Sequence, residues 1–373
     1  MRLIVLKAAV LLMRAAYFFM KLLPSQKKVV FLSRQSNSPS LDFSLLAKSI
    51  DSLSPDVQIV FVCRMIEAGA VGKLSYLGTV LRSMYHLATA SACVTDTYSI
   101  PVSLLRHKRG LFVLQLWHAL GAVKKFGYQT LNKQSGSSSA VASAMSMHKN
   151  YDCIASTGER TSRIYAQAFN TEEDKILPLG MPRIDYILSK DEQKLSYIRG
   201  LDPRLTSKRN ILYVPTFRRN SSGEIADIKR HFDFENYNLI IKPHVLDTAT
   251  AYEELEDAII IADESVLLYD LYKLCDIIIT DYSSAAFEAA LLLKPVYFYV
   301  YDIDMYTDDP GLNVNLLEEM PHCTSRRFED IMDGIRSGNY SSEWIASFRD
   351  SFFDVDLSQS CSDNIAKLIL QKI

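Results

Sequence analysis

The chain of 373 residues lacks the motifs that most readily assign a function. It contains no GxxxxGK[ST] loop, no GxGxxG fingerprint and no GxSxG elbow, which are the signatures of P-loop proteins, dinucleotide-binding enzymes and serine hydrolases. Its six cysteines lie far apart without a CxxC pair or zinc spacing, a pattern typical of free thiols in a reducing compartment. The formal net charge of −2 gives no general attraction to nucleic acid, so no nucleic-acid partner is expected.

A long uninterrupted apolar run is also missing, although residues 1–23 (MRLIVLKAAVLLMRAAYFFMKLL) are strongly hydrophobic. Lys7, Arg14 and Lys21 recur every seven residues, so a helix places them on one face and breaks up the run of roughly 18–20 apolar residues that a spanning helix needs. We expect residues 1–24 to form an amphipathic helix in the membrane interface. A helix packed on the protein's own core and a short signal anchor stay open as alternatives.

What the chain does contain is alternation of short apolar runs with amphipathic stretches, which predicts βαβ units and parallel sheets. A polar stretch at 188–209 separates two such series. We therefore predict an α/β protein with two Rossmann-like domains facing a cleft, at 25–195 and 205–350, and a C-terminal helical segment at 351–373. The expected strands lie at 29–33, 57–63, 92–96, 111–117, 152–156, 175–180, 211–217, 237–244, 258–263, 275–280 and 295–300.

The clearest candidate site is TDYSS at 280–284, which follows the apolar run DIII and precedes the helix-like AAFEAALLL. Ser283 and Ser284 stand where a helix N-cap is expected, beside Asp281. A helix N-terminus at the carboxyl end of a parallel strand is a common phosphate-binding site. An ordinary serine cap, with Glu288 complementing the helix dipole, is the alternative interpretation.

A second candidate is LQLWHALGAVKKFGY at 114–128. His118 ends a predicted strand, and a neutral imidazole can accept a proton from a hydroxyl at physiological pH. Lys124 and Lys125 follow within seven residues and can balance phosphate charge. A hydrogen-bonded structural histidine would give the same local pattern.

Two further strand ends carry charge in the second series. Lys242 and His244 flank a proline in NLIIKPHVL, and Thr216 and Arg218 follow the run ILYVP. Such groups can bind a diphosphate, and Arg can do so with two parallel hydrogen bonds. Solvated basic turns are the alternative. The stretch DID at 302–304 has the DxD form of metal–diphosphate sites, but its aspartates also suit a turn, and no metal or cofactor is predicted.

Taken in order, these segments resemble the CDP-glycerol glycerophosphotransferase family of teichoic acid synthesis, of primase or polymerase type. The resemblance rests on WHALGAVKKFGY, GMPRID (180–185), YVPTFR (213–218), KPH (242–244) and TDYSSAAFEAALLLKPVYFYVYDIDMY (280–306). It covers roughly residues 90–320 and departs from the family pattern at Glu288, where an Asp is usual, and at DDPGLNVN (308–315), where an Arg-Gly-Phe-Tyr-like stretch is usual.

The resemblance implies a glycosyltransferase-B-like architecture and transfer of glycerol phosphate or ribitol phosphate from a CDP-linked donor to a lipid-linked acceptor. It further implies peripheral attachment at the cytoplasmic face of the cell membrane. His118 and His244 are then the candidate catalytic residues, with His118 as general base. The implied donor-binding residues are Thr216, Arg218, Lys242, His244, Asp281, Ser283 and Ser284, and the candidate acceptor or phosphate contacts are Lys124, Lys125 and Arg183.

Two other functions remain compatible with the sequence. A nucleotide-sugar glycosyltransferase uses the same scaffold, because a fold alone does not fix the donor. A non-catalytic membrane-bound assembly partner would keep the fold without the chemistry. The choice between glycerol and ribitol, and between one added unit and many, also stays open, with a slight preference for a primase or short-chain transferase.

Overall fold

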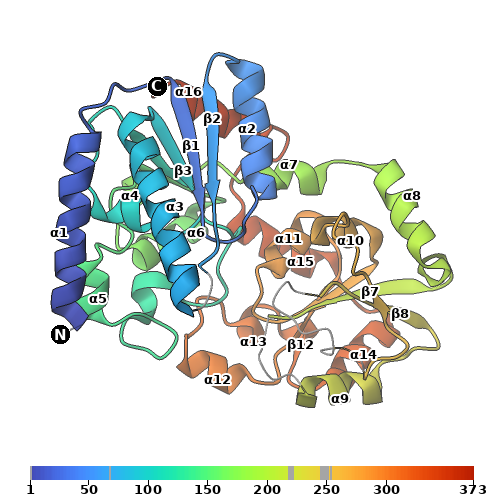
Figure 1. Cartoon of the computed structure of the whole chain (residues 1–373). Helices are drawn as coiled ribbons and strands as arrows, with labels where there is room; N and C mark the ends of the chain where they lie inside the picture. Colours follow the sequence, from blue (N-terminus) through green and yellow to red (C-terminus); the bar gives the residue numbers. More distant parts are fainter. Residues whose placement is uncertain (1, 67–68, 217–221, 244–251, 253) are drawn as a thin grey trace. The chain divides into compact units, whose positions relative to one another are not determined.

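The computed structural model describes residues 2–66, 69–216, 222–243, 252 and 254–373, and the chain divides into two compact units. Unit 1 comprises Met1–Leu120, Phe126–Asp185 and Phe353–Ile373, and unit 2 comprises Gly121–Lys125 and Tyr186–Phe352. Each unit contains one six-stranded sheet in which every strand pair is parallel. The prediction of two α/β units with parallel sheets is therefore confirmed (Figure 1).

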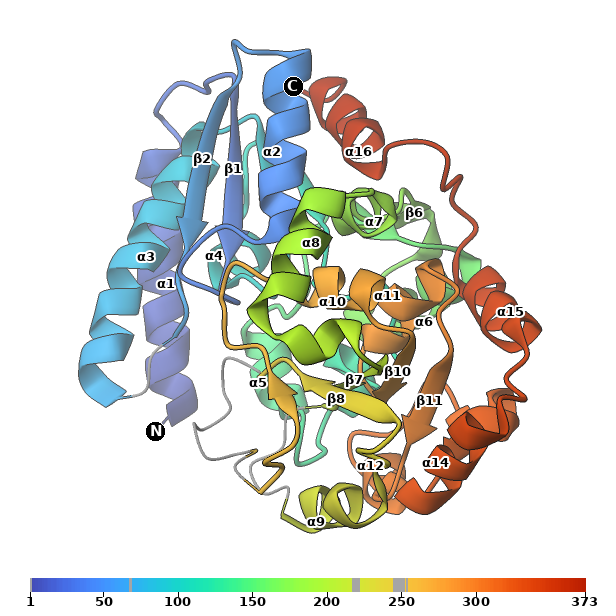
Figure 2. The same cartoon turned by 90° about the vertical axis from the view of Figure 1, so that its right-hand side faces the viewer.

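The sheet of unit 1 has the strand order β2-β1-β3-β4-β5-β6. Its central strands are apolar runs buried on both faces, as parallel strands between helices must be. Figure 2 shows α1 and α3 on one face of this sheet and α2 and α16 on the other. The strands are β1 Lys28–Ser33, β2 Gln58–Cys63, β3 Ala92–Thr95, β4 Phe112–Gln115, β5 Cys153–Ser156 and β6 Ile176–Pro178. The helices are α1 Arg2–Met20, α2 Leu41–Leu53, α3 Gly69–Thr89, α4 Ile100–Leu104, α5 Ser139–Ala144, α6 Glu159–Phe169, α7 Pro182–Leu188 (which runs across the boundary between the units) and α16 Cys361–Leu370, with the 3₁₀ turns η1 Gly127–Thr130 and η2 Glu173–Lys175.

The sheet of unit 2 has the order β12-β11-β10-β7-β8-β9, which counted within the unit is 6-5-4-1-2-3, the strand order of dinucleotide-binding Rossmann folds. Its strands are β7 Arg209–Val214, β8 Tyr237–Ile241, β9 Ile259–Ile260, β10 Ile277–Thr280, β11 Val296–Tyr299 and β12 Thr324–Ser325. Its helices are α8 Glu192–Leu201, α9 Ser222–His231, α10 Leu268–Leu274, α11 Ala285–Leu291, α12 Ile303–Asp308, α13 Leu316–Glu319, α14 Phe328–Ser337 and α15 Ser342–Phe352, with the turns η3 Pro203–Thr206 and η4 Pro321–Cys323.

The end of the chain, Phe353–Ile373, belongs to unit 1 and contains helix α16, in the range 351–373 where a helical segment was expected. Helix α16 packs against α2, and the Asp185 carboxylate accepts hydrogen bonds from Ser360 Oγ and from the backbone N–H groups of Cys361 and Ser362 at 2.8–2.9 Å. A carboxylate at a helix N-terminus satisfies donors that the helix itself leaves unpaired. In this part of the chain the boundary between the two units falls at Asp185.

Helix α1 packs on unit 1 through one face and leaves another uncovered. Tyr17 is 1% exposed and donates to His107 Nδ1 at 2.8 Å, while Arg14 Nε donates to the Leu104 carbonyl at 3.4 Å. His107 Nε2 lies 2.8 Å from the Val102 carbonyl and therefore donates, which leaves Nδ1 as the acceptor. The packed-helix alternative thus accounts for this face. In the part of the chain that the structure describes, no helix has the length and hydropathy of a membrane span.

Candidate active site

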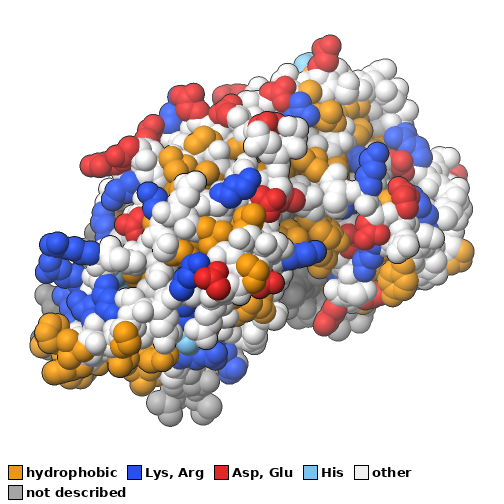
Figure 3. Space-filling view, turned by 90° about the horizontal axis from the view of Figure 1, so that it is seen from above, with side chains coloured by type: hydrophobic (Ala, Val, Ile, Leu, Met, Phe, Trp, Pro, Cys, Tyr) orange, Lys and Arg blue, Asp and Glu red, His pale blue; other side chains and the backbone are white. Residues whose placement is uncertain are grey.

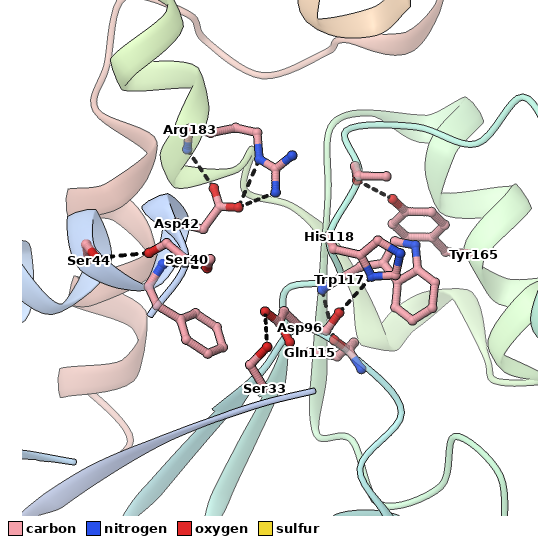
Figure 4. Close-up of polar contacts among 12 residues, drawn as sticks. Ser33, Ser40, Asp42, Ser44, Asp96, Gln115, Trp117, His118, Tyr165 and Arg183 are labelled. Atoms are coloured by element: carbon pink, nitrogen blue, oxygen red, sulfur yellow. Dashed lines mark hydrogen bonds and ion pairs between the residues drawn. The ribbon is translucent and has the colours of Figure 1, made fainter. Parts of the chain in front are cut away.

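Unit 1 reverses its strand order between β1 and β3, and polar side chains gather at that point. In open α/β sheets, ligands bind at the carboxyl ends of the strands beside such a reversal. Ser33 ends β1, Asp96 follows β3 and His118 follows β4, so the three residues come from neighbouring or next-neighbouring strands. Figure 4 shows them around one end of the sheet.

The ring of His118 is held with one nitrogen as a donor. Its Nδ1 lies 3.0 Å from the backbone carbonyl of Asp96, and because a carbonyl only accepts, Nδ1 carries the proton and Nε2 keeps its lone pair. Burial lowers the pKa of His118 to about 4; the carbonyl hydrogen bond opposes this effect and the Arg183 charge adds to it. His118 is therefore neutral at physiological pH, in the tautomer that a general base with a reactive Nε2 requires.

The backbone just before His118 is strained and is fixed by a buried amide. Trp117 has φ 62°, a left-handed conformation that costs a non-glycine residue about 1–2 kcal/mol. Its N–H donates to Gln115 Oε1 at 2.8 Å, and Gln115 Nε2 donates to the Thr97 carbonyl at 3.1 Å. Gln115 is fully buried. Its side chain thus determines the turn from which the His118 ring projects.

We expect Gln115→Leu to lower kcat about tenfold or more while leaving the affinity for a nucleotide donor unchanged. Leucine fills similar space but leaves Trp117 N–H without its partner, at a cost of about 1–3 kcal/mol, and leaves the Thr97 carbonyl with the Thr95 hydroxyl as its remaining donor. Steady-state kinetics with a thermal melt measure both effects. An unchanged kcat in a folded variant would show that this amide does not position His118.

Asp96 is a buried carboxyl with one oxygen in use. Its Oδ2 accepts from Ser33 Oγ at 2.9 Å, whereas Oδ1 has no hydrogen-bond partner among the described residues, and the residue is 3% exposed. Burial raises the pKa of Asp96 to about 7, and the Ser33 hydrogen bond opposes the rise. An unpaired carboxyl oxygen in a buried position has the chemistry to bind a hydroxyl group.

Asp96→Asn is expected to stabilise the protein more at pH 8 than at pH 5. Since folding raises the Asp96 pKa above its unfolded value near 3.9, the contribution of Asp96 to stability is full below that value and is lost as pH rises through about 7. Asparagine retains an acceptor for Ser33 and does not ionise. Urea denaturation at both pH values tests this, with roughly 1.4 kcal/mol per pKa unit as the scale. An equal difference in unfolding free energy between Asp96→Asn and wild type at both pH values would contradict this expectation.

Arg183, predicted as an acceptor or phosphate contact, forms a buried ion pair. Its backbone N–H donates to Asp42 Oδ1 at 2.8 Å and its Nε to Asp42 Oδ2 at 2.9 Å, with Nη2 also bonded to Oδ2. Both side chains are less than a tenth exposed. The pair joins the start of α2 to the start of α7, and its two charges act on the pKa of His118 in opposite directions.

Unit 2 has its own reversal of strand order, between β7 and β10, and there Thr216 and Asp281 meet. The Asp281 carboxylate accepts from Thr216 N–H at 2.9 and 3.0 Å and from Thr216 Oγ1 at 2.9 Å. Asp281 is 2% exposed, so these bonds lie in a low-dielectric surrounding. Asp281 therefore holds the start of the loop that follows β7.

Lys124 belongs to this group in unit 2. Its Nζ donates to Thr216 Oγ1 at 3.2 Å and lies 5.6 Å from the centre of the Tyr306 ring, which stacks on Tyr282 at 4.2 Å. The structure thus places Lys124 among the predicted donor-binding residues. Local sequence could not show this, because the residues on either side of 121–125 belong to unit 1, whereas 121–125 belongs to unit 2.

The segment 121–125 is held by the DDPGLNVN stretch that departs from the family pattern. Lys125 N–H donates to the Gly311 carbonyl at 2.9 Å, and Asn313 N–H donates to the Val123 carbonyl at 2.7 Å. At Gly121 a Cβ atom would lie 2.8 Å from the Phe287 ring, so this position has no room for a side chain. The stretch therefore positions Lys124 through backbone contacts.

Ser283 and Ser284 lie where the sequence predicted them, at the start of α11, but they do not cap it as expected. Ser284 is the N-cap residue in right-handed helical conformation and makes no capping side-chain bond, while Ser283 Oγ accepts from Ala285 N–H at 3.3 Å. The short α11 has seven residues. Glu288, which follows, is buried and accepts from Tyr272 OH at 3.0 Å.

The tyrosine-rich strand β11 holds helix α9. Tyr299 donates to Asp227 at 2.6 Å and Tyr301 to Glu224 at 2.8 Å, and Tyr213 of β7 also bonds Glu224. Three phenols thus fix the two carboxylates of the helix that begins just after 217–221. The strand's role in the described residues is structural.

The remaining predicted residues differ in how far the structure describes them. Arg218 and His244 lie outside the described residues. Lys242 Nζ donates to the Asp263 carbonyl at 2.6 Å, and burial lowers its pKa. In the DID stretch, Asp304 pairs with Arg326 at 2.7 Å. Within the described part of the chain, no group of three or more His, Cys, Asp or Glu side chains could hold a metal ion.

Sequence reasoning did not select Ser33, Asp96 or Gln115. Each is a polar residue at the carboxyl end of an apolar strand, in VVFLS, ACVTD and LFVLQLW. That pattern was present in the sequence, but only the strand order shows that β1 and β3 flank the reversal.

The sequence profile of the family described as CDP-Glycerol:Poly(glycerophosphate) glycerophosphotransferase matches residues 15–371. The chain is 34% identical to the teichoic acid ribitol-phosphate primase of Bacillus spizizenii, over 85% of this chain and 84% of that protein. It is 27% identical to the teichoic acid glycerol-phosphate primase of Bacillus subtilis, over 78% and 77%. A solved structure of the wall teichoic acid polymerase TagF, a variant with CDPG, has a similar fold with TM-score 0.73 at 21% identity, over 96% of this chain and 92% of that one.

Proposed function

Because the chain belongs to the CDP-glycerol:poly(glycerophosphate) glycerophosphotransferase family of teichoic acid primases and polymerases, we propose that it transfers glycerol phosphate or ribitol phosphate from a CDP-activated donor to a lipid-linked acceptor. The observation that carries the proposal within the structure is His118, a neutral imidazole with its Nε2 lone pair available. The solved TagF variant with CDPG supports a CDP-linked donor.

The chemistry assigned to His118 is proton removal. Nε2 takes the proton of an acceptor hydroxyl, and the oxygen attacks the β-phosphorus of the CDP-polyol. The bond between that phosphorus and the bridging oxygen of CMP breaks, so that CMP leaves with the electron pair. General base catalysis of this kind contributes typically about 10²–10⁴-fold.

The donor-binding role is assigned to unit 2. Lys124 and Thr216 lie at the strand reversal, where a diphosphate binds in folds of this strand order. Fixed positive charge stabilises the transferring phosphoryl group and the leaving phosphate without reorganisation during the reaction. Arg218, Lys242, His244, Ser283 and Ser284 complete the proposed donor-binding set, with Asp281 holding Thr216 in place. A base in one unit and the donor-binding residues in the other is the arrangement of glycosyltransferase-B-like enzymes.

The donor is tested by product analysis. Purified protein is incubated with a lipid-linked acceptor and, separately, CDP-glycerol, CDP-ribitol and UDP-sugars. We expect CMP from one or both CDP-polyols and no UDP or UMP. UDP release alone would instead establish the nucleotide-sugar glycosyltransferase. If no donor is turned over, and teichoic acid synthesis in cells is unaffected by loss of His118, the non-catalytic assembly partner is established.

Attachment to the cytoplasmic face of the cell membrane is a second part of the proposal, because helix α1 has an uncovered apolar face. Leu11, Leu12, Phe18, Phe19 and Leu22 recur at helical spacing and are 60–75% exposed. In Figure 3 hydrophobic side chains gather at the lower left, on the side of α1, beside a group of Lys and Arg. Apolar side chains next to basic ones suit an anionic membrane interface, and a lipid-linked acceptor requires proximity to one.

Replacing both Phe18 and Phe19 with serine is expected to move the protein from the membrane to the soluble fraction while CDP-glycerol binding is retained. Phe18 and Phe19 are 60% and 67% exposed, so the substitution removes apolar area without opening the core. Met305→Ser, at a 60% exposed position of unit 2, is the matched control. Vesicle sedimentation measures the effect, and unchanged sedimentation of the double variant would assign attachment to another surface.

A further inference from the structure

Arg34 is the first residue after β1, at the strand reversal of unit 1. Its guanidinium lies 5.4 Å from the centre of the Tyr98 ring, a cation–π contact that limits its movement. The side chain is partly buried, and Nε has no hydrogen-bond partner among the described residues. A buried donor without a partner requires an explanation in a folded protein.

The surroundings of Arg34 are aromatic. Its charge acts on the phenols of Tyr98 and Tyr151, and it interacts with the Tyr76 phenol through both charge and a side-chain hydrogen bond. Burial lowers the pKa of His148 to about 3, with a further decrease due to Arg34. In the described part of the chain, Arg34 forms no ion pair with a carboxylate. The guanidinium therefore faces neutral rings, in an environment where an anion would complete its hydrogen bonding.

A second arginine leaves the sheet next to Arg34. Ser33 pairs with Cys63 in the parallel register of β1 and β2, and Arg64 N–H continues the ladder to the Ser33 carbonyl at 3.1 Å. Arg34 and Arg64 are thus adjacent strand ends, about 4.8 Å apart in strand spacing. Arg64 also lines a cavity of about 320 Å³ whose described lining includes Arg82 and no acidic residue.

We propose that Arg34, with Arg64 beside it, binds a phosphate group of the acceptor at the strand reversal of unit 1. The inference rests on the proposed function and adds to it the chemical class of the acceptor contact, a phosphoester or diphosphate. Strands β1 and β4 are separated by two strand spacings, so a phosphate at Arg34 stands roughly 10 Å from the strand end that carries His118. A polyol phosphate or sugar phosphate at the acceptor terminus spans such a distance. Asp96 lies between them, just after the end of β3, where it can bind an acceptor hydroxyl.

The test compares Arg34→Gln and Arg34→Lys with wild type. Arg34→Gln removes the charge, and Arg34→Lys keeps it but loses the planar fork and the stacking on Tyr98. The matched control is Arg109→Gln, an arginine that lines a different cavity, beside the start of β4. The readouts are the acceptor KM, the KM of CDP-glycerol, and calorimetric binding of inorganic pyrophosphate to protein saturated with CDP-glycerol.

We expect Arg34→Gln to raise the acceptor KM about tenfold or more, the effect of one charge-assisted hydrogen bond, and to abolish pyrophosphate binding. In Arg34→Gln the KM of CDP-glycerol stays at the wild-type value. The Arg109→Gln control keeps wild-type values in every readout. If Arg34→Gln lowers the melting temperature as well, Arg34→Lys decides: a raised acceptor KM in a stable Lys variant supports the inference, and a wild-type value overturns it.

Pyrophosphate binding separates this inference from the proposed function. Wild-type protein that binds pyrophosphate through Arg34 but transfers nothing refutes the proposed function and keeps the anion site. Protein that transfers polyol phosphate with Arg34→Gln at wild-type acceptor KM refutes the site and keeps the function. Loss of binding to phosphatidylglycerol vesicles in Arg34→Gln, with acceptor KM unchanged, would assign the arginine to lipid headgroups and overturn the acceptor role.

Discussion

Replacing His118 with asparagine is expected to lower kcat for polyol-phosphate transfer by about 10²–10⁴-fold while CDP-glycerol still binds with wild-type affinity. Asparagine can donate its side-chain amide to the Asp96 carbonyl as Nδ1 does, but it has no basic nitrogen in place of Nε2. The donor candidates Lys124 and Thr216 belong to unit 2 and are unaffected. Release of CMP measures kcat, and calorimetry measures the donor affinity.

His322→Asn is the matched control, because His322 is an exposed histidine of unit 2 stacked on Trp344. It should retain wild-type kcat. A His118→Asn variant within tenfold of wild type would exclude His118 as the general base and leave a structural histidine, the alternative that the sequence had left open.

The pH profile gives an independent check on His118. Because burial lowers its pKa to about 4, the neutral base persists well below the usual histidine range, and kcat/KM should fall only as pH approaches that value. Asp96→Asn should keep the same acid limb, since His118 bonds the backbone carbonyl of residue 96 and not its carboxyl group. An acid limb near pH 6.5 that is present in wild type and persists in Asp96→Asn would contradict this assignment.

Replacing Asp281 with alanine is expected to weaken CDP-glycerol binding by about a hundredfold or more. Thr216 N–H and Oγ1 both lose their acceptor, at about 1–3 kcal/mol for each buried group, and the loop after β7 is released with them. Lys124 then loses the fixed position of its Thr216 partner. Calorimetric titration with CDP-glycerol measures the loss.

The matched control is Asp276→Ala, at the opposite end of the same strand pair. The Asp276 carboxylate accepts from Asn210 N–H at 2.7 Å at the start of β7, as Asp281 accepts from Thr216 after its end. Both variants should lose stability, but only Asp281→Ala should lose donor affinity. Equal donor affinity in the two variants would show that the carboxyl ends of β7 and β10 do not form the donor site.

Local sequence patterns predicted the elements of the fold well. Apolar runs such as VVFLS and VQIVFVC correspond to β1 and β2 within one residue at each end. The signal is strong in β1, which is buried on both faces, and it persists in β2, a partly exposed edge strand. Asp281 and His118 were selected for the same reason: each follows such a run directly, at the carboxyl edge where ligands bind.

What local patterns could not predict were contacts between distant segments. The 121–125 segment joins unit 2 through backbone bonds to 311–313, nearly 190 residues later in the chain. The return of α16 to unit 1 depends on Asp185, whose neighbours in sequence give no sign of a partner at 360–362. The ion pair of Arg183 could not be predicted for the same reason, since its partner Asp42 is 141 residues away.

The most direct measurement of the central claim is the mass of the acceptor after reaction. A defined lipid-linked acceptor is incubated with CDP-glycerol or CDP-ribitol, and intact-mass spectrometry is combined with quantification of CMP. The account predicts that the acceptor gains the mass of one or more polyol phosphates, with one CMP released for each unit gained. CMP release without a gain in mass, or a gain that corresponds to a sugar, would contradict it.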